Sequence, residues 1–189
     1  MNRSTFFLII LFISFCISRC GNGTTINENE ASDVIVEYLK ANPEYQTTNF
    51  TFGEITFKGK NDNVDLAKYK ELEEKGFIAM TLQEQKKRFL SKDSSFVYQV
   101  ELTDKSAPYV LKQNNNKATV KSATYILDDL KPVNFEKVNN NTAKATVSLK
   151  KVETDFYPFQ NNKNSNSDFI TKTYRLKLKK DAGWRVDGK

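Results

Sequence analysis

The sequence predicts an α+β protein, in which N-terminal helices with a small β-wing are followed by an antiparallel β-meander. Two segments, 32–41 and 64–75, carry apolar residues at helical spacing. Beyond residue 113 the chain is a series of short segments of alternating apolar and polar residues, joined by polar turns. Helices that come first and strands that come afterwards are typical of α+β folds.

The two predicted helices are recognised by their apolar faces and by their ends. The first contains two apolar pairs with a spacing of four, Val34 with Tyr38 and Ile35 with Leu39. Pro43 ends this helix, because the residue before a proline avoids helical backbone. The second has a buried stripe formed by Leu66, Tyr69 and Leu72. Gly76 follows it, at a place where helices often end in left-handed backbone.

The predicted strands follow from alternation. Segment 50–57 alternates weakly around Gly53, which indicates a bulge. Segment 77–82 is a further strand, and segments 87–90 and 96–103 form the wing hairpin. In the second half, strands are predicted at 118–127, 133–138, 143–152, 169–179 and 184–186. We expect Trp184 to anchor the C-terminal hairpin by packing against segment 169–179.

The N-terminus predicts export. Arg3 precedes an apolar run of twelve residues, 6–17, and a helix of that length spans roughly 18 Å of a hydrocarbon core that is about 30 Å thick. The pattern is typical of a lipoprotein-type signal peptide at 1–19, with lipidation at Cys20. Arg19 departs from the small residue that usually precedes such a cysteine, so ordinary secretory cleavage at 16–18 or 21–23 is the alternative. Segment 20–30 is then a flexible tether, followed by an α+β subdomain at 31–112 and an antiparallel β subdomain at 113–189.

Composition excludes several kinds of chemistry. The 189 residues include no histidine, which excludes the Ser-His-Asp triad and histidine-based zinc sites. Both cysteines, Cys16 and Cys20, lie in or at the leader, so an exported body would carry no catalytic thiol and no disulfide. The net charge is +6, or +4 without Arg3 and Arg19, and the lysines are spread along the chain. Export argues against a nucleic-acid partner, and no cofactor, metal ligand set or catalytic residue is predicted.

One aromatic run is the candidate partner surface. Phe156, Tyr157 and Phe159 stand next to the long polar loop 160–168, and would mark a binding surface if they were exposed together. The carboxylates of Glu153 and Asp155 flank the run, which is also compatible with a carboxylate site beside aromatic rings that stack on a sugar.

Two resemblances add to this interpretation. Residues 72–78 (Leu-Glu-Glu-Lys-Gly-Phe-Ile) and 101–106 (Glu-Leu-Thr-Asp-Lys-Ser) resemble the helix end and the wing of winged-helix domains. The whole layout, which ends in the Gly183-Trp184 hairpin, is similar to a group of uncharacterised exported bacterial lipoproteins with such an N-terminal half and a β-rich C-terminal half. The resemblance implies a place in the envelope, but no activity and no site residues.

The predicted function is therefore that of an envelope-anchored lipoprotein with a non-catalytic binding or structural role. Its expected partners are the membrane, through the lipid at Cys20, and an envelope protein or glycan. The protein would face the periplasm or the cell surface. Two alternatives are a carboxylate-dependent enzyme acting on envelope glycans and a carrier of a small apolar ligand.

Overall fold

The computed structural model describes residues 25–58, 62–87, 94–160 and 167–188. The predicted signal peptide 1–19, the lipidation residue Cys20 and the first part of the tether lie outside the described residues. Of the described residues, 55% are in strands and 24% in helices. The fold is thus mostly β, and the predicted arrangement of N-terminal helices with a wing followed by a meander is wrong.

Two α-helices and two 3₁₀ helices are present in the described residues. They are α1 (Glu28–Ala41), α2 (Asn63–Glu74), η1 (Asp104–Tyr109) and η2 (Tyr157–Phe159). The strands are β1 (Glu44–Thr51), β2 (Gly53–Lys58), β3 (Ile78–Lys87), β4 (Ser94–Leu102), β5 (Val110–Asn114), β6 (Lys117–Leu127), β7 (Asn134–Asn139), β8 (Thr142–Glu153), β9 (Phe169–Lys179) and β10 (Gly183–Val186). The predicted strand at 77–82 is the first half of β3, which continues to Lys87, and most of the predicted strand 87–90 lies outside the described residues.

The strands form two antiparallel sheets. In the seven-stranded sheet the order is β1-β6-β8-β9-β10, with β5 paired to β6 and β7 paired to β8. This sheet curls into a half-barrel. The small sheet has the order β2-β4-β3. Gly53, whose φ of +87° favours glycine, stands where the chain leaves β1 and starts β2, so the expected bulge is a change of sheet.

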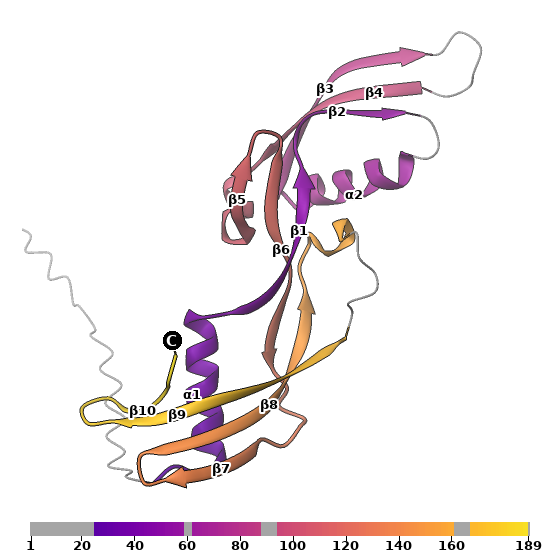
Figure 1. Ribbon diagram of the computed structural model, residues 1–189. Helices are drawn as coiled ribbons and strands as arrows, with labels where there is room; N and C mark the ends of the chain where they lie inside the picture. Colours follow the sequence, from indigo (N-terminus) through magenta and orange to yellow (C-terminus); the bar gives the residue numbers. More distant parts are fainter. Residues whose placement is uncertain (1–24, 59–61, 88–93, 161–166, 189) are drawn as a thin grey trace, which may run out of the picture.

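The molecule is elongated, with two lobes joined by long strands (Figure 1). In the lower lobe, α1 packs on the curled sheet made by β7, β9, β10 and the adjoining parts of β6 and β8. In the upper lobe, α2 packs with the small sheet, β5 and the far ends of β1 and β6. Each lobe has its own core, and both cores take side chains from before and after residue 113. The division into subdomains at that residue stays a prediction.

The placement of the helices explains why the predicted fold class fails. A winged-helix domain packs its helices together, but here α1 and α2 belong to different cores. The apolar face of α1, with Ala31, Ile35 and Leu39 buried, covers strands that follow it by about a hundred residues. Its N-terminus is fixed by a capping box in which the Asn27 side chain accepts from the Glu30 backbone and the Glu30 carboxylate accepts from the Asn27 backbone.

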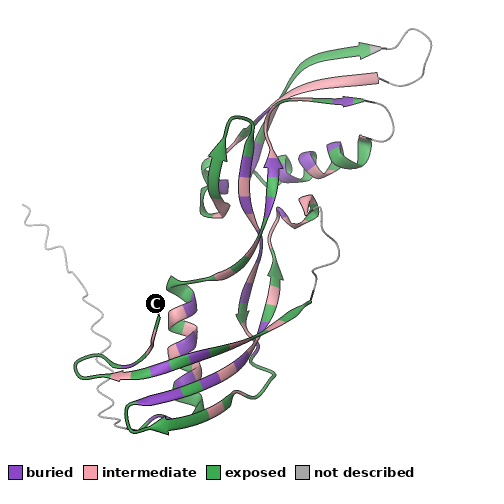
Figure 2. Ribbon diagram, in the orientation of Figure 1, coloured by how far each residue is buried: buried purple, intermediate pink, exposed green. Residues whose placement is uncertain are grey.

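Two local predictions are confirmed. Helix α2 buries Leu66, Tyr69 and Leu72, and Gly76 follows it with a φ of +77°. In the C-terminal hairpin Trp184 stands opposite Leu178 and is 7% exposed, within the lower core. Figure 2 shows the alternation of buried and exposed residues along the lower strands, which is the pattern from which the strands were predicted.

Candidate functional site

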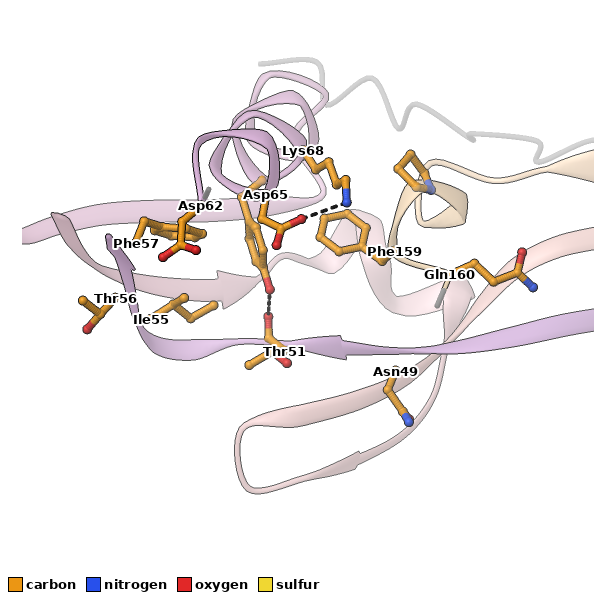
Figure 3. A pocket seen from close by; sticks show the side chains of 12 residues that line it. Asn49, Thr51, Ile55, Thr56, Phe57, Asp62, Asp65, Lys68, Phe159 and Gln160 are labelled. Carbon is orange, nitrogen blue, oxygen red and sulfur yellow. Dashed lines mark hydrogen bonds and ion pairs between the residues drawn. The ribbon is translucent and has the colours of Figure 1, made fainter. Parts of the chain in front are cut away.

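A surface hollow of about 390 Å³ lies in the upper lobe, between α2, the strands β1 and β2, and the turn η2. Figure 3 shows its lining. Helix α2 provides one wall, β2 and the end of β1 provide the opposite wall, and Phe159 and Gln160 close the end formed by η2. The hollow therefore combines segments that are about a hundred residues apart in the sequence.

Aromatic rings form the floor of the hollow. The ring of Tyr69 lies 5.5 Å from Phe57 and 5.1 Å from Phe159, in both cases edge to face. Phe50 supports them from the core, with its ring 5.0 Å from that of Phe159. Such edge-to-face contacts hold each ring in a fixed orientation, because the positive ring edge meets the negative face of its neighbour. The floor is thus rigid. Phe57 and Tyr69 are buried in it, so the partly exposed Phe159 offers most of its accessible ring surface.

The hydroxyl of Tyr69 is held in the floor as a donor. It donates to the backbone oxygen of Thr51 over 2.8 Å. Burial raises the pKa of Tyr69 well above its usual value, and the nearby charge of Asp65 raises it further. The hydroxyl therefore stays protonated, and it ties α2 to the end of β1.

Charged and amide groups form the rim. Asp65 and Lys68, one turn apart on α2, form an ion pair with an N–O distance of 2.8 Å. Asp62 accepts from the backbone N–H of Lys58 over 2.6 Å, which joins the start of α2 to the end of β2. Both carboxylates stand at the N-terminal end of α2, where the helix dipole favours negative charge. Asn49 and Gln160 also line the hollow.

The turn η2 is attached to β1 by polar contacts. The Thr48 hydroxyl donates to the Phe159 carbonyl over 2.9 Å, and the Gln160 amide donates to the Gln46 side-chain oxygen over 3.2 Å. Gln46 in turn donates to the Tyr125 hydroxyl over 2.6 Å. The Gln160 side-chain oxygen is buried and has no hydrogen-bond partner among the described residues. The end wall of the hollow is thus positioned by strand β1.

The three aromatic residues predicted as a partner surface do not form one exposed patch. Phe156 is fully buried in the upper core, in contact with Phe50. Tyr157 is half-buried, with its ring 5.1 Å from the Lys151 ammonium. Of the three, Phe159 alone lines the hollow. The physical reason is the tight 3₁₀ turn: Phe156 and Phe159 stand three residues apart and so lie on the same side, both packed on Phe50, whereas Tyr157 does not share that side.

The carboxylates that flank the aromatic run do not line the hollow. Asp155 pairs with Lys75 at 3.0 Å, and Glu153 lies 3.9 Å from the Lys151 ammonium. Hydrogen bonds to Glu71 and then to Asp155 raise the pKa of Lys75. For Lys151, desolvation lowers the pKa but the hydrogen bonds to Asp168 and Tyr157 outweigh it, so the pKa is raised.

The charged residues of the hollow were not predicted from the sequence. Asp62, Asp65 and Lys68 recur at a spacing of three, which places them on one face at the start of a predicted helix. From that spacing, the sequence could have predicted that the three charged side chains lie along one rim. The end wall could not be found in this way, because it depends on the packing of η2.

The described residues define a mostly β protein with an aromatic-floored, polar-rimmed surface hollow. Within them, no cluster of three or more carboxylates or thiols could hold a metal ion. No helix among them has the length and apolar character needed to cross a membrane. Comparison with family models, with curated proteins and with solved structures finds no match to the chain.

Proposed function

We propose that the protein is a lipid-anchored, non-catalytic binding protein of the bacterial cell envelope, and that the hollow between α2 and η2 binds a short segment of an envelope glycan. The leader supports the envelope location, and Cys20 would carry the lipid. The observation that carries the binding role is the rigid floor of Phe57, Tyr69 and Phe159 beneath a rim of charged and amide groups.

A sugar ring fits this combination of surfaces. Its C–H groups form apolar faces that stack on aromatic side chains, while its hydroxyl and acetamido groups need hydrogen-bond donors and acceptors around the edge. Asp65 and Asn49 supply acceptors on this rim, and Lys68 supplies a donor. Small-ligand sites typically combine an apolar floor with a small number of polar groups that converge on the ligand.

The state of the two rim carboxylates favours binding over hydrolysis. A glycosidase needs one carboxyl group as proton donor and a second as base or nucleophile. Here Asp65 is engaged by Lys68, and Asp62 accepts a hydrogen bond from the backbone N–H of Lys58. Both carboxylates thus already have partners within the protein.

Calorimetric titration with soluble muropeptides, released from purified cell wall by lysozyme, tests the glycan proposal. The Phe159→Ala variant should bind about 5-fold more weakly, since burying the partly exposed ring of Phe159 stabilises by roughly 1 kcal/mol. Phe169→Ala is the matched control, because Phe169 is a partly exposed ring of the lower lobe. Lys68→Ala should weaken binding while it leaves the fold intact, since its ion pair is exposed.

The outcomes separate the candidates. Unchanged affinity in both hollow variants, or no binding by the native protein, overturns the glycan site. Cleavage of the muropeptides by the native protein would instead favour a carboxylate enzyme. Radiolabelled palmitate incorporation tests the anchor separately: label should be lost in Cys20→Ala, and equal labelling of both proteins refutes the anchor.

A further inference from the structure

One face of the lower lobe, opposite α1, is strongly basic. Along β8 and β9 every second residue points into the core, as Ala145, Leu149 and Leu176 do. The residues between them point away from α1, because side chains alternate along a strand. We name the outward residues Lys144, Lys150, Arg175, Lys177 and Arg185 the basic face; all are exposed.

Cations of the basic face stand directly opposite each other. In the antiparallel register Lys144 is paired with Arg175, and Lys177 is paired with Arg185. Opposite side chains in a sheet have Cβ atoms about 4.5–5.5 Å apart, and like charges in such pairs destabilise the sheet. Two carboxylates adjoin the basic face: Glu136 of β7 stands opposite Lys144 in the register, and Asp187 lies 4.0 Å from Arg175. In the described part of the chain Lys144 and Lys177 nevertheless form no ion pair. An anion bound between these strands would relieve the repulsion.

Hydroxyl groups continue the basic face toward Lys150. Thr146 stands opposite Thr173, with their hydroxyl oxygens 2.8 Å apart, and Ser148 stands opposite Thr171. Hydroxyls can donate to phosphate oxygens as the lysines do. The strip along β8 and β9 therefore offers several donors in a row and few acceptor charges.

An apolar patch adjoins the basic face on the same side of the sheet. Ile126 and Phe169 both stand opposite Lys150, one on each neighbouring strand, and are 51% and 37% exposed. Val152 and Tyr45, also exposed, stand one row further along, on either side of Thr124. The Lys131 ammonium lies 3.8 Å from the centre of the Phe169 ring. Exposed aliphatic and aromatic groups next to lysines are the combination that proteins use at membrane interfaces.

We propose that the basic face and its apolar patch lie against an anionic lipid bilayer. The lysines and arginines would bind lipid phosphates, while Ile126 and Phe169 would enter the headgroup region. The apolar patch favours a bilayer over a soluble polyanion, because a soluble polyanion has no apolar region in which the patch could be buried. The orientation rests in one respect on the proposed anchor. Cys20 stands six residues before Ile26, the first residue of the lower core. A lipid on Cys20 would therefore keep this lobe within about 20 Å of the bilayer.

Vesicle co-sedimentation of the chain from Gly21 to Lys189 tests the proposal without the lipid. Both described cores are built between Ile26 and Trp184, and the far-UV circular dichroism of each protein checks the fold. Binding to vesicles of phosphatidylglycerol should greatly exceed binding to phosphatidylcholine and should weaken in high salt. The triple variant Lys144→Gln, Lys177→Gln, Arg185→Gln should bind about 100-fold more weakly, since each cation near an anionic surface contributes about 5-fold.

A matched control has the same loss of charge on the upper lobe: Lys70→Gln, Lys112→Gln, Lys117→Gln, all at exposed positions. This variant should bind vesicles like the native chain. Phe169→Ala should lower vesicle binding several-fold and leave binding to soluble polyphosphate unchanged. Equal losses in the two triple variants, equal binding to neutral vesicles, or an unchanged Phe169→Ala variant would each overturn the bilayer proposal. None of these measurements depends on Cys20 or on the hollow, so they fail independently of the proposed function.

Discussion

Replacing Phe156 with alanine tests how far η2 contributes to the upper core. Its side chain is fully buried, and its ring lies 5.3 Å from Phe50, 5.8 Å from Phe77 and 6.0 Å from Tyr109. Truncation of a buried phenylalanine loses the transfer free energy of the ring and leaves a cavity, which together cost about 3–5 kcal/mol. A domain of this size is stabilised by roughly 5–15 kcal/mol, so the expected loss is a large fraction of the total.

Urea-induced unfolding, followed by circular dichroism, measures this loss as a lower midpoint with an unchanged slope. Tyr157→Ala is the control, because the neighbouring ring is half-buried and packs only on the Lys151 side of the turn. It should cost about 1 kcal/mol. A cost below 1 kcal/mol for Phe156→Ala would refute the packing of η2 in the upper core. It would restore the interpretation of Phe156 as part of an exposed partner surface.

Three further variants test local features. Asn27→Ala removes the side-chain cap of α1 and should lower the free energy of unfolding by about 1 kcal/mol in urea; an unchanged midpoint contradicts the capping box. Gly76→Ala forces a side chain into backbone with φ +77° and should cost about 1–2 kcal/mol, although no atom lies close enough to clash; a stabilised variant would show that the backbone relaxes. Tyr174→Phe concerns pH: desolvation first, and then the charges of Glu44 and Tyr38, raise the pKa of Tyr174 to about 12 from its ordinary value of 10.0. Because the folded state holds this proton more tightly, its contribution to stability is complete below pH 10 and is lost as the pH rises toward 12. The phenylalanine variant should lose less stability than the native protein across that interval, and equal losses would contradict the raised pKa.

Local structure was predictable wherever a single segment carries its own signal. Helix α2 was found because Leu66, Tyr69 and Leu72 form a stripe and Gly76 supplies the stop. The predicted strand 118–127 corresponds to β6, and the predicted strand 143–152 corresponds to β8, because alternation reports one buried face. The C-terminal hairpin was found from its turn and from Trp184.

The fold class was missed because it depends on pairings between distant segments. Strand β1 pairs with β6, and the two are separated by about 70 residues. No local pattern shows this pairing, since an alternating strand can add to any sheet that offers an edge. Helix α1 was expected to pack with the other N-terminal elements, but its apolar face is complementary to β8, β9 and β10. The hollow was missed for the same reason, because its walls come from α2 and from β1 and β2, and its end comes from the distant turn η2.

The arrangement of the two lobes explains how one chain can carry two separate surfaces. Strand β6 runs from one lobe into the other, and it buries Ala118 and Val120 in the upper core and Tyr125 in the lower core. The buried side chains of β8 belong to the lower core. The hollow depends on Tyr69, Phe159 and the upper core, whereas the basic face depends on the register of β8, β9 and β10 in the lower core. Because the cores share no buried side chain, substitutions on one surface leave the packing of the other unchanged. If the lower lobe lies on the bilayer, the length of the connecting strands places the hollow away from the lipid, where a glycan segment would reach it.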